Sequence, residues 1–214
     1  IFDMDGTLVD SSITIANAIN YVREHLYLLP MDPRLIIQKI NDHHLNPAQY
    51  FYKTDHFEAD HETLFSEYYT QNHEKELLLY DGIKEMLLDL TSKGKELAVA
   101  TNAYRGSTIE SLTPLGIYDL FDTIACYDDV THGKPYPDML LKILDVLGRE
   151  PEEELFVGDG SRDKMASQRA GIAYLMVNWG FSDHEKAIRS VDALRQTLDG
   201  YLWSGSSDSG NQNA

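Results

Sequence analysis

The feature that most constrains the fold is a series of short apolar runs separated by segments with helical periodicity. Four runs have the length and composition of buried strands, at residues 96–101, 122–127, 154–159 and 173–179. The helices expected near and between them cover residues 83–90, a segment opening on the capping box Ser107–Glu110, residues 137–147 and the segment from Ser161 to Gly171. Strands that alternate with helices of this length predict an α/β fold with a parallel sheet covered on both faces.

Residues 12 to about 79 interrupt this alternation. Ile15, Ile19, Val22 and Leu26 share one helical face, and two Asx-Pro pairs, at 32–33 and 46–47, have the form of helix starts. A further helix is expected over residues 60–73. Several helices without a strand predict a separate helical domain at 12–79, inserted into a core made of residues 1–11 and 80–203. The composition of residues 204–214 is typical of a flexible tail.

The charge balance limits the possible partners. The chain has 18 basic and 35 acidic residues, a net charge of −17. Such a chain is repelled by nucleic acids and by anionic membranes, so neither is expected as a partner. A bound anion would need a few placed cationic side chains, helix N-termini or a metal ion.

Cysteine content and hydropathy bear on location. The single cysteine, Cys126, excludes an internal disulfide framework and favours a reducing, cytoplasmic compartment. The sequence contains no apolar run as long as a membrane span and no recognisable signal peptide. Because Ile1 and Phe2 alone are too short for a strand, we expect residues upstream of Ile1 to be missing.

Polar residues follow three of the expected strands. Asp3 and Asp5 follow the first apolar residues, Thr101-Asn102 follow the run at 96–101, and residues 158–163 read Gly-Asp-Gly-Ser-Arg-Asp. In open parallel sheets ligands bind beyond the carboxyl ends of the strands. If these ends are adjacent, four carboxylates (Asp3, Asp5, Asp159 and Asp163) meet Lys134 from the loop HGKPYPD. This excess of carboxylates needs a cation, and hard oxygen ligands favour Mg²⁺.

These motifs together resemble the haloacid dehalogenase superfamily. The sequence has DMDGTLVD, then Thr-Asn after an apolar strand, then GKPYPDM, then VGDGSRDKMASQRAG, in the order that the family has them. The resemblance covers nearly the whole chain and implies a Rossmann-like parallel sheet with residues 12–79 as a helical C1 cap. AVATN and VNWGF are similar to the phosphoglycolate phosphatase-like branch.

The resemblance also implies roles for single residues. Asp3 resembles the nucleophile that forms an aspartyl phosphate, and Asp5 resembles the general acid/base. Thr101, Asn102 and Lys134 resemble the groups that bind the substrate phosphate. The implied Mg²⁺ ligands are the Asp3 carboxylate, the Asp5 carbonyl and Asp159, while Asp163 resembles an outer partner of the metal.

The spacing of the two aspartates has a physical reason. Along a strand, Asp3 and Asp5 point to the same face, so both can reach one reactive centre. Asp3 must stay ionised to attack, whereas Asp5 must exchange a proton and needs a higher pKa. The resemblance therefore implies a Mg²⁺-dependent phosphatase acting on a small phosphorylated metabolite, and the spacing of the two aspartates agrees with it.

Other functions stay open. A mutase resembling β-phosphoglucomutase would use the same residues, and a non-catalytic binding protein could share the fold. A dehalogenase or a phosphonatase is disfavoured because relatives with those activities lack the aspartate that Asp5 supplies. Phosphoglycolate is suggested as a substrate only by the resemblance to the family. The sequence does not indicate the oligomeric state. The segment QKINDHHLNPAQ lacks the glycine typical of the cap specificity loop, which makes His43 and His44 candidates for substrate selection.

Overall fold

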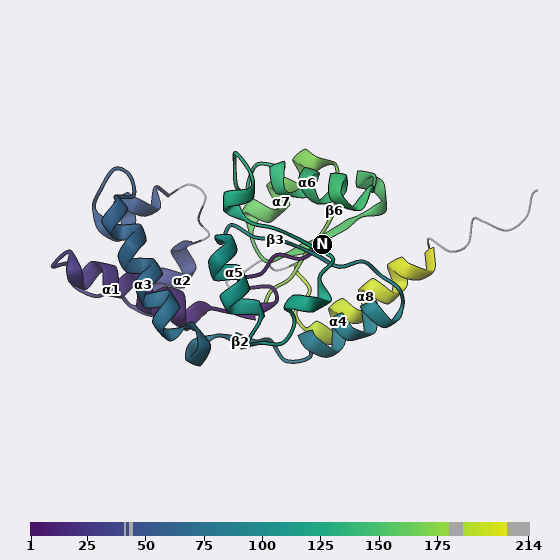
Figure 1. The fold of residues 1–214 in the computed structure, drawn as a ribbon, viewed down its shortest axis with the longest axis horizontal. Coiled ribbons are helices and arrows are strands. Elements are labelled where there is room, and N and C mark those ends of the chain that lie inside the picture. Colours follow the sequence, from purple (N-terminus) through teal and green to yellow (C-terminus); the bar gives the residue numbers. More distant parts are fainter. Residues whose placement is uncertain (41, 43–44, 180–185, 205–214) are drawn as a thin grey trace, which may run out of the picture.

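The computed structural model describes residues 1–40, 42, 45–179 and 186–204 (Figure 1). Its helices are α1 Ser12–His25, α2 Pro33–Ile40, α3 Ala59–Glu76, α4 Ile83–Ser92, α5 Arg105–Leu112, α6 Asp138–Leu147, α7 Ser161–Ala170 and α8 Val191–Ser204. Its strands are β1 Val9–Asp10, β2 Leu78–Leu79, β3 Ala98–Ala100, β4 Thr123–Ala125, β5 Leu155–Gly158 and β6 Ala173–Met176. Short helical turns are η1 Ala48–Tyr52, η2 Tyr118–Leu120, η3 Tyr127–Asp129 and η4 Pro151–Glu153. His43, His44 and residues 205–214 of the predicted tail lie outside the described residues.

The N-terminal residues form the centre of the sheet. β3 pairs in parallel with β4, and β5 pairs in parallel with β6. Phe2 joins the two pairs, because its N–H donates to Ala98 O (2.8 Å) while Asp3 N–H donates to Val157 O (2.8 Å). The order across the sheet is therefore β4, β3, residues 1–3, β5 and β6. This confirms the predicted α/β class with a parallel sheet.

Alternating residues of the sheet face two separate apolar layers. Phe2, Val99 and Val157 pack on one face against α4, α5 and α8, with Ile83, Met86, Leu87, Leu90, Leu112, Leu194 and Leu198. Ile1, Ala98, Ala100 and Phe156 pack on the other face against α6 and α7, with Met139, Leu140, Ile143, Leu144, Ala166 and Ala170. This two-residue alternation is the one that strand geometry imposes. It places the central strand between two cores, so its end is fixed from both sides.

The helix predicted to open at the capping box Ser107–Glu110 begins earlier. α5 starts at Arg105, and the extended residue Tyr104 precedes it. The reason is a contact distant in sequence, because Asp128 Oδ1 accepts a hydrogen bond from Arg105 N (2.9 Å) and satisfies the first turn of the helix. The expected helices at 83–90, 137–147 and 161–171 correspond to α4, α6 and α7, and Gly148 and Gly171 end the last two in the left-handed region (φ +64° and +75°).

The segment between β1 and β2 contains α1, η1, α2 and α3, and it has an apolar cluster of its own. The cluster consists of Ile15, Ala16, Ile19, Val22, Ile36, Phe51 and Tyr52. Arg23 lies beneath it, 7% exposed, and its guanidinium donates to the carbonyls of Leu29 and Phe51. Two short strands, β1 and β2, pair antiparallel where this segment leaves and rejoins the core, with Val9 opposite Leu79.

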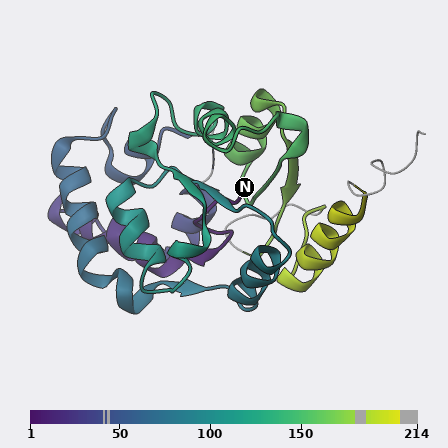
Figure 2. The same cartoon turned by 45° about the vertical axis from the view of Figure 1, so that its right-hand side comes forward.

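One face of the helical segment contacts the core. The hydroxyls of Tyr69 on α3 and Ser111 on α5 are 3.1 Å apart. Figure 2 shows α1, α2 and α3 on the side of the sheet opposite α8, with α5 next to α3. Within the described part of the chain, no helix combines the length and the apolar character needed to cross a bilayer.

Candidate active site

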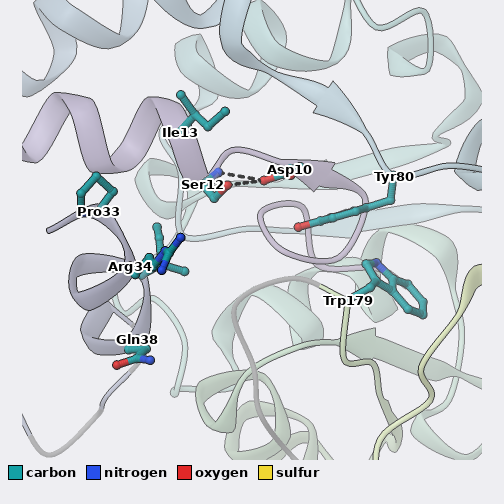
Figure 3. Close-up of a pocket in the computed structure, with 9 residues that line it drawn as sticks. Asp10, Ser12, Ile13, Pro33, Arg34, Gln38, Tyr80 and Trp179 are labelled. Atoms are coloured by element: carbon teal, nitrogen blue, oxygen red, sulfur yellow. Dashed lines mark hydrogen bonds between the residues drawn. The ribbon is translucent and has the colours of Figure 1, made fainter.

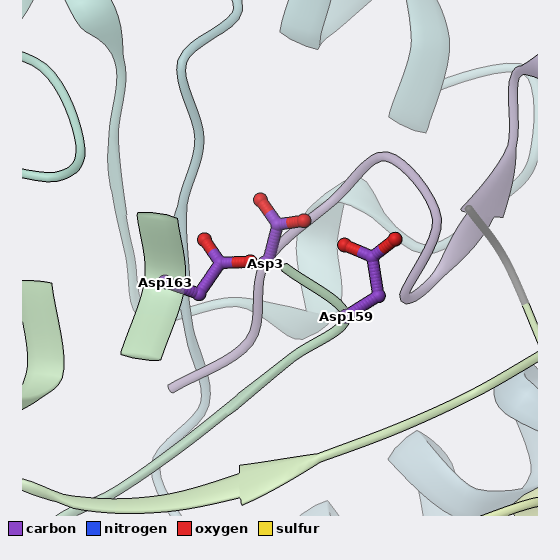
Figure 4. Close-up of side chains that lie close together, drawn as sticks. All are labelled: Asp3, Asp159 and Asp163. Carbon is purple, nitrogen blue, oxygen red and sulfur yellow. The ribbon is translucent and has the colours of Figure 1, made fainter. Parts of the chain in front are cut away.

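Three carboxylates meet at the carboxyl end of the central strand (Figure 4). Asp3 directly follows Phe2, Asp159 directly follows β5, and Asp163 lies in the first turn of α7. One oxygen of each lies within 4.8 Å of an oxygen of the others. Each residue is at most 6% exposed, so water screens their mutual repulsion poorly.

Lys134 lies against this group of carboxylates. Its Nζ is 2.5 Å from Asp3 Oδ1 and 2.7 Å from Asp163 Oδ1, and the residue is 7% exposed. Burial lowers the pKa of Lys134, but the two carboxylates Asp163 and Asp3 more than offset this, so the net shift is upward. The lysine is therefore a fixed positive charge beside Asp3.

One lysine does not balance the carboxylates. Burial raises the pKa of Asp3 to about 7, with Asp163 and Asp5 adding to the rise and Lys134 opposing it. A carboxylate in this position is ionised only at a cost in free energy near neutral pH. The site is short of positive charge, which is the condition that a divalent cation would relieve.

Asn102 holds the loop that carries Lys134. Its Oδ1 accepts from Lys134 N (2.8 Å), and its Nδ2 donates to Lys134 O (3.0 Å). Gly133 is needed for this approach, since a Cβ there would lie 2.7 Å from Asn102 Oδ1 and 2.7 Å from the Tyr127 ring. Thr101, 1% exposed, accepts from Ala103 N (3.0 Å) and so shapes the turn that presents Asn102.

A second glycine allows α7 to approach the sheet. A Cβ at Gly158 would lie 2.8 Å from the side chain of Asp163. Asp163 Oδ2 also accepts from Gly160 N (3.0 Å), so one carboxylate caps α7 and binds Lys134 at once. Its predicted place as an outer partner of a metal stays a prediction, because its carboxylate belongs to the same group as those of Asp3 and Asp159.

Asp5 lies outside the group of three carboxylates. Its Oδ1 is buried, as is Ser11 Oγ. Burial raises the pKa of Asp5, and the nearby Ser11 side chain and the Lys134 ammonium oppose part of that rise. The structure thus brings Asp3, Asp159, Asp163 and Lys134 together as the sequence suggested. The predicted role of the Asp5 carbonyl as a metal ligand stays a prediction.

Residues 1–177 match the haloacid dehalogenase-like hydrolase family. The chain belongs to this family. It is 34% identical to phosphoglycolate phosphatase of Chromobacterium violaceum over 192 residues, with 85% of each chain covered. It is 30% identical to pyrophosphatase PpaX of Oceanobacillus iheyensis over 184 residues, covering 86% of this chain and 84% of the relative.

A solved structure of the same family agrees with the fold. It is a crystal structure from Haemophilus somnus 129PT, described as a predicted phosphoglycolate phosphatase, with a TM-score of 0.74, 29% identity and 85% of each chain covered. The resemblance inferred from the four motifs is therefore confirmed, as is the prediction of a hydrolase of the phosphatase type. The roles assigned to single residues stay predictions.

The hydrolase fold also forms a pocket that sequence analysis did not predict (Figure 3). It has a volume of about 440 Å³ and lies between α2 and the core residues Tyr80 and Trp179. The Trp179 indole donates to Thr7 O (3.0 Å), in the turn that also carries Asp3 and Asp5. The signals in the sequence were Tyr80, which directly follows the expected helical domain at 12–79, and Trp179, which ends the last expected strand at 173–179, but nothing linked them to α2.

Proposed function

We propose that this hydrolase is a phosphatase that cleaves a small, phosphoglycolate-like phosphomonoester through an aspartyl phosphate on Asp3. The observation that carries the proposal is the position of Asp3 Oδ1, 2.5 Å from a buried lysine and beside two further buried carboxylates. A buried ammonium next to a buried carboxylate is the arrangement needed to hold a phosphoryl group in reach of a nucleophile.

The donor set fits a magnesium ion. Asp3, Asp159 and Asp163 offer hard oxygen atoms within 4.8 Å of one another, and Lys134 alone cannot balance three buried carboxylates. We assign Asp3, Asp159 and the Asp5 carbonyl as ligands, with Asp163 beside them. When bound, the ion would neutralise carboxylate and phosphate charge.

The proposed reaction has two steps, formation of the aspartyl phosphate and its hydrolysis. Asp3 attacks phosphorus as the ester P–O bond breaks, and the Asp5 carboxylic acid gives its proton to the leaving alkoxide. The Asp5 carboxylate then takes a proton from a water molecule, which attacks phosphorus, releases phosphate and restores Asp3. The raised pKa of Asp5 supports this part, because a proton donor must stay protonated until the ester bond breaks.

We further propose that residues 12–79 form a cap over the site and that Thr101, Asn102 and Lys134 orient the phosphate. The separate apolar cluster of this segment and the paired strands at its two ends support the division. Asn102 would act through its two bonds to the Lys134 main chain.

The test is turnover of p-nitrophenyl phosphate and 2-phosphoglycolate with Mg²⁺ and with excess EDTA. We expect hydrolysis with Mg²⁺ only, and mass spectrometry after rapid quench should find the phosphoryl group on the peptide containing Asp3. A phosphoryl group on another residue, or full activity in EDTA, would contradict the proposal. Transfer to a sugar phosphate much faster than to water would favour a mutase instead.

A further inference from the structure

The ammonium group of Lys134 has a third neighbour besides its two carboxylates. Its Nζ lies over the ring of Phe156 in β5, 5.6 Å from the ring centroid. Phe156 is fully buried and Lys134 is 7% exposed, so bulk water hardly screens the pair. A cation within about 6 Å of a ring centroid is attracted to the negative face of the ring, and the attraction is largest where water is excluded.

This contact differs from the other aromatic contacts of the described residues. One other cation lies over a ring there, Arg169 above Tyr136, and that ring is 51% exposed. Phe2 and Phe51 are buried like Phe156, but neither has a cation over its ring within the described part of the chain. Phe156 thus combines burial with a cation that belongs to the proposed phosphate site.

The fold fixes the ring of Phe156 from several sides. Phe156 belongs to the apolar layer between the sheet and helices α6 and α7. On the neighbouring strand it is paired with Tyr174, and the two ring centroids are 5.9 Å apart. The Tyr174 hydroxyl donates to Gly160 O (3.2 Å), which fixes the second ring as well. The ring is therefore a rigid surface beside a lysine that comes from a loop.

The contacts of Lys134 do not all persist during the proposed reaction. Asn102 binds only its main chain, so the long side chain must be placed by the groups around Nζ. Asp3 and Asp163 are two of these groups. When Asp3 forms its bond to phosphorus, its carboxylate loses the negative charge and the ion pair with Lys134 weakens. The face of Phe156 is the same before and after this step.

We propose that Phe156 is a positioning residue for Lys134, and that its ring directs the ammonium toward the phosphoryl group in both steps of the reaction. The inference rests on the proposed phosphatase function and adds to it a residue that does not touch the substrate. Sequence analysis placed Phe156 only within the apolar run at 154–159.

The experiment changes the charge distribution of the ring and nearly preserves its shape. Incorporation of unnatural amino acids replaces Phe156 with 4-fluorophenylalanine, 3,5-difluorophenylalanine or 3,4,5-trifluorophenylalanine. Each added fluorine withdraws electron density from the face of the ring and so weakens its attraction for a cation. A side chain that only fills space in the core should not respond to this change.

We expect kcat/KM for p-nitrophenyl phosphate with Mg²⁺ to fall stepwise along the series, by about 5- to 30-fold in total, as for a desolvated cation–π contact. The fall is expected because the ring matters more as the charge of Asp3 is consumed. Rapid-quench mass spectrometry should also show that phosphorylated Asp3 persists longer with each added fluorine.

The same three amino acids at position 51 are the matched control. Phe51 is 2% exposed and lies in the apolar cluster of the helical segment, away from any cation among the described residues. There kcat/KM should stay the same within error. A flat series at Phe156, or an equal fall at Phe51, would overturn the inference and leave the phosphatase function in place.

A double-mutant cycle tests the contact without turnover. In urea titrations of the metal-free protein, trifluorination of Phe156 should lower the free energy of unfolding more in the wild type than in Lys134→Met, which has no ammonium over the ring. Equal changes in the two proteins would contradict the inference. If the wild type cleaves neither p-nitrophenyl phosphate nor 2-phosphoglycolate, the proposed function is wrong, and the positioning role is wrong with it.

Discussion

The parallel sheet and the helical segment between β1 and β2 differ in how completely their buried polar side chains are paired. At the end of the sheet, Asp3, Asp163 and Lys134 are fixed by ion pairs of 2.5 and 2.7 Å. Near the two ends of the helical segment, Thr14 Oγ1 and Glu76 Oε2 are buried and have no hydrogen-bond partner among the described residues.

This difference bears on how substitutions in the two regions should act. Buried polar atoms without partners cost free energy, and their concentration at one junction marks it as the less completely bonded part of the described structure. Changes at the sheet end should thus affect every ester alike. Changes in the helical segment should affect esters unequally or alter stability alone.

The largest effect is expected from Asp3→Asn. An amide is a poor nucleophile toward phosphorus, so turnover of every ester should fall below detection. The measurement is steady-state hydrolysis of four chemically different phosphoesters, with circular dichroism to check the fold. Residual activity that varied among esters would show that the sheet end also takes part in selection.

Asp5→Asn should reduce kcat by about 10²–10⁴-fold, the usual contribution of general acid–base catalysis. With p-nitrophenyl phosphate the leaving group needs no proton, so formation of the phosphoryl enzyme should suffer less than its hydrolysis. Rapid-quench mass spectrometry should then find phosphorylated Asp3 accumulating. Wild-type hydrolysis by this variant would contradict the role assigned to Asp5.

Gly133→Ala should lower kcat/KM about 10- to 100-fold for all esters. The added Cβ would meet Asn102 and Tyr127 at 2.7 Å and shift the loop of Lys134, and displacements of about 1 Å have costs of this size. Gly106→Ala is the control, because nothing lies within 4 Å of a Cβ at that helical position. Equal activity of the two variants would mean that the loop position is not critical.

Arg23→Met changes the helical segment alone. It removes the hydrogen bonds to the carbonyls of Leu29 and Phe51, so the free energy of unfolding should fall by about 2–3 kcal/mol. We expect kcat/KM to change less than 10-fold and by different factors for different esters. Arg149→Met is the comparison, because it breaks only an exposed ion pair with Glu96. Its free energy of unfolding, measured by urea titration, should fall by about 0–1 kcal/mol.

The last prediction concerns the stability of the metal-free protein alone. The folded-state pKa of Asp3 is raised to about 7 from 3.8, so its protonated form favours folding. This contribution is complete below about pH 4, where it amounts to a few kcal/mol, and it is lost as the pH rises through 7. Urea titrations in EDTA at several pH values should show this slope, and Asp3→Asn should reduce it. A slope that is the same in both proteins would assign the pH dependence to other groups.

The sheet and its site were predictable because each depends on local pattern. Apolar runs such as 154–159 identify strands, and parallel strands necessarily present their carboxyl ends at one edge. Asp3, Asp159 and Asp163 could therefore be grouped before the structure was known. The start of α5 could not be predicted, because it depends on Asp128, which is 23 residues from Arg105.

The helical segment was predictable only in outline. Its helices follow from Asx-Pro starts and apolar faces, but the buried Arg23 binds the carbonyl of Leu29 in a loop and that of Phe51 in η1, which no local pattern places together. The pocket depends in the same way on the packing of α2 against Tyr80 and Trp179. Contacts between regions were the part that single-sequence reasoning missed.

The pairing of Val9 with Leu79 makes the helical segment interchangeable. The chain leaves and re-enters the sheet domain through two neighbouring strands, whose paired Cα atoms are about 5 Å apart in such ladders. Closing a loop between fixed neighbours depends weakly on its length, since doubling the number of residues costs only about 0.6 kcal/mol. Segments of different size should therefore be tolerated between β1 and β2 without moving Asp3. These two strands are the natural junctions for building chimeric enzymes with new selectivity.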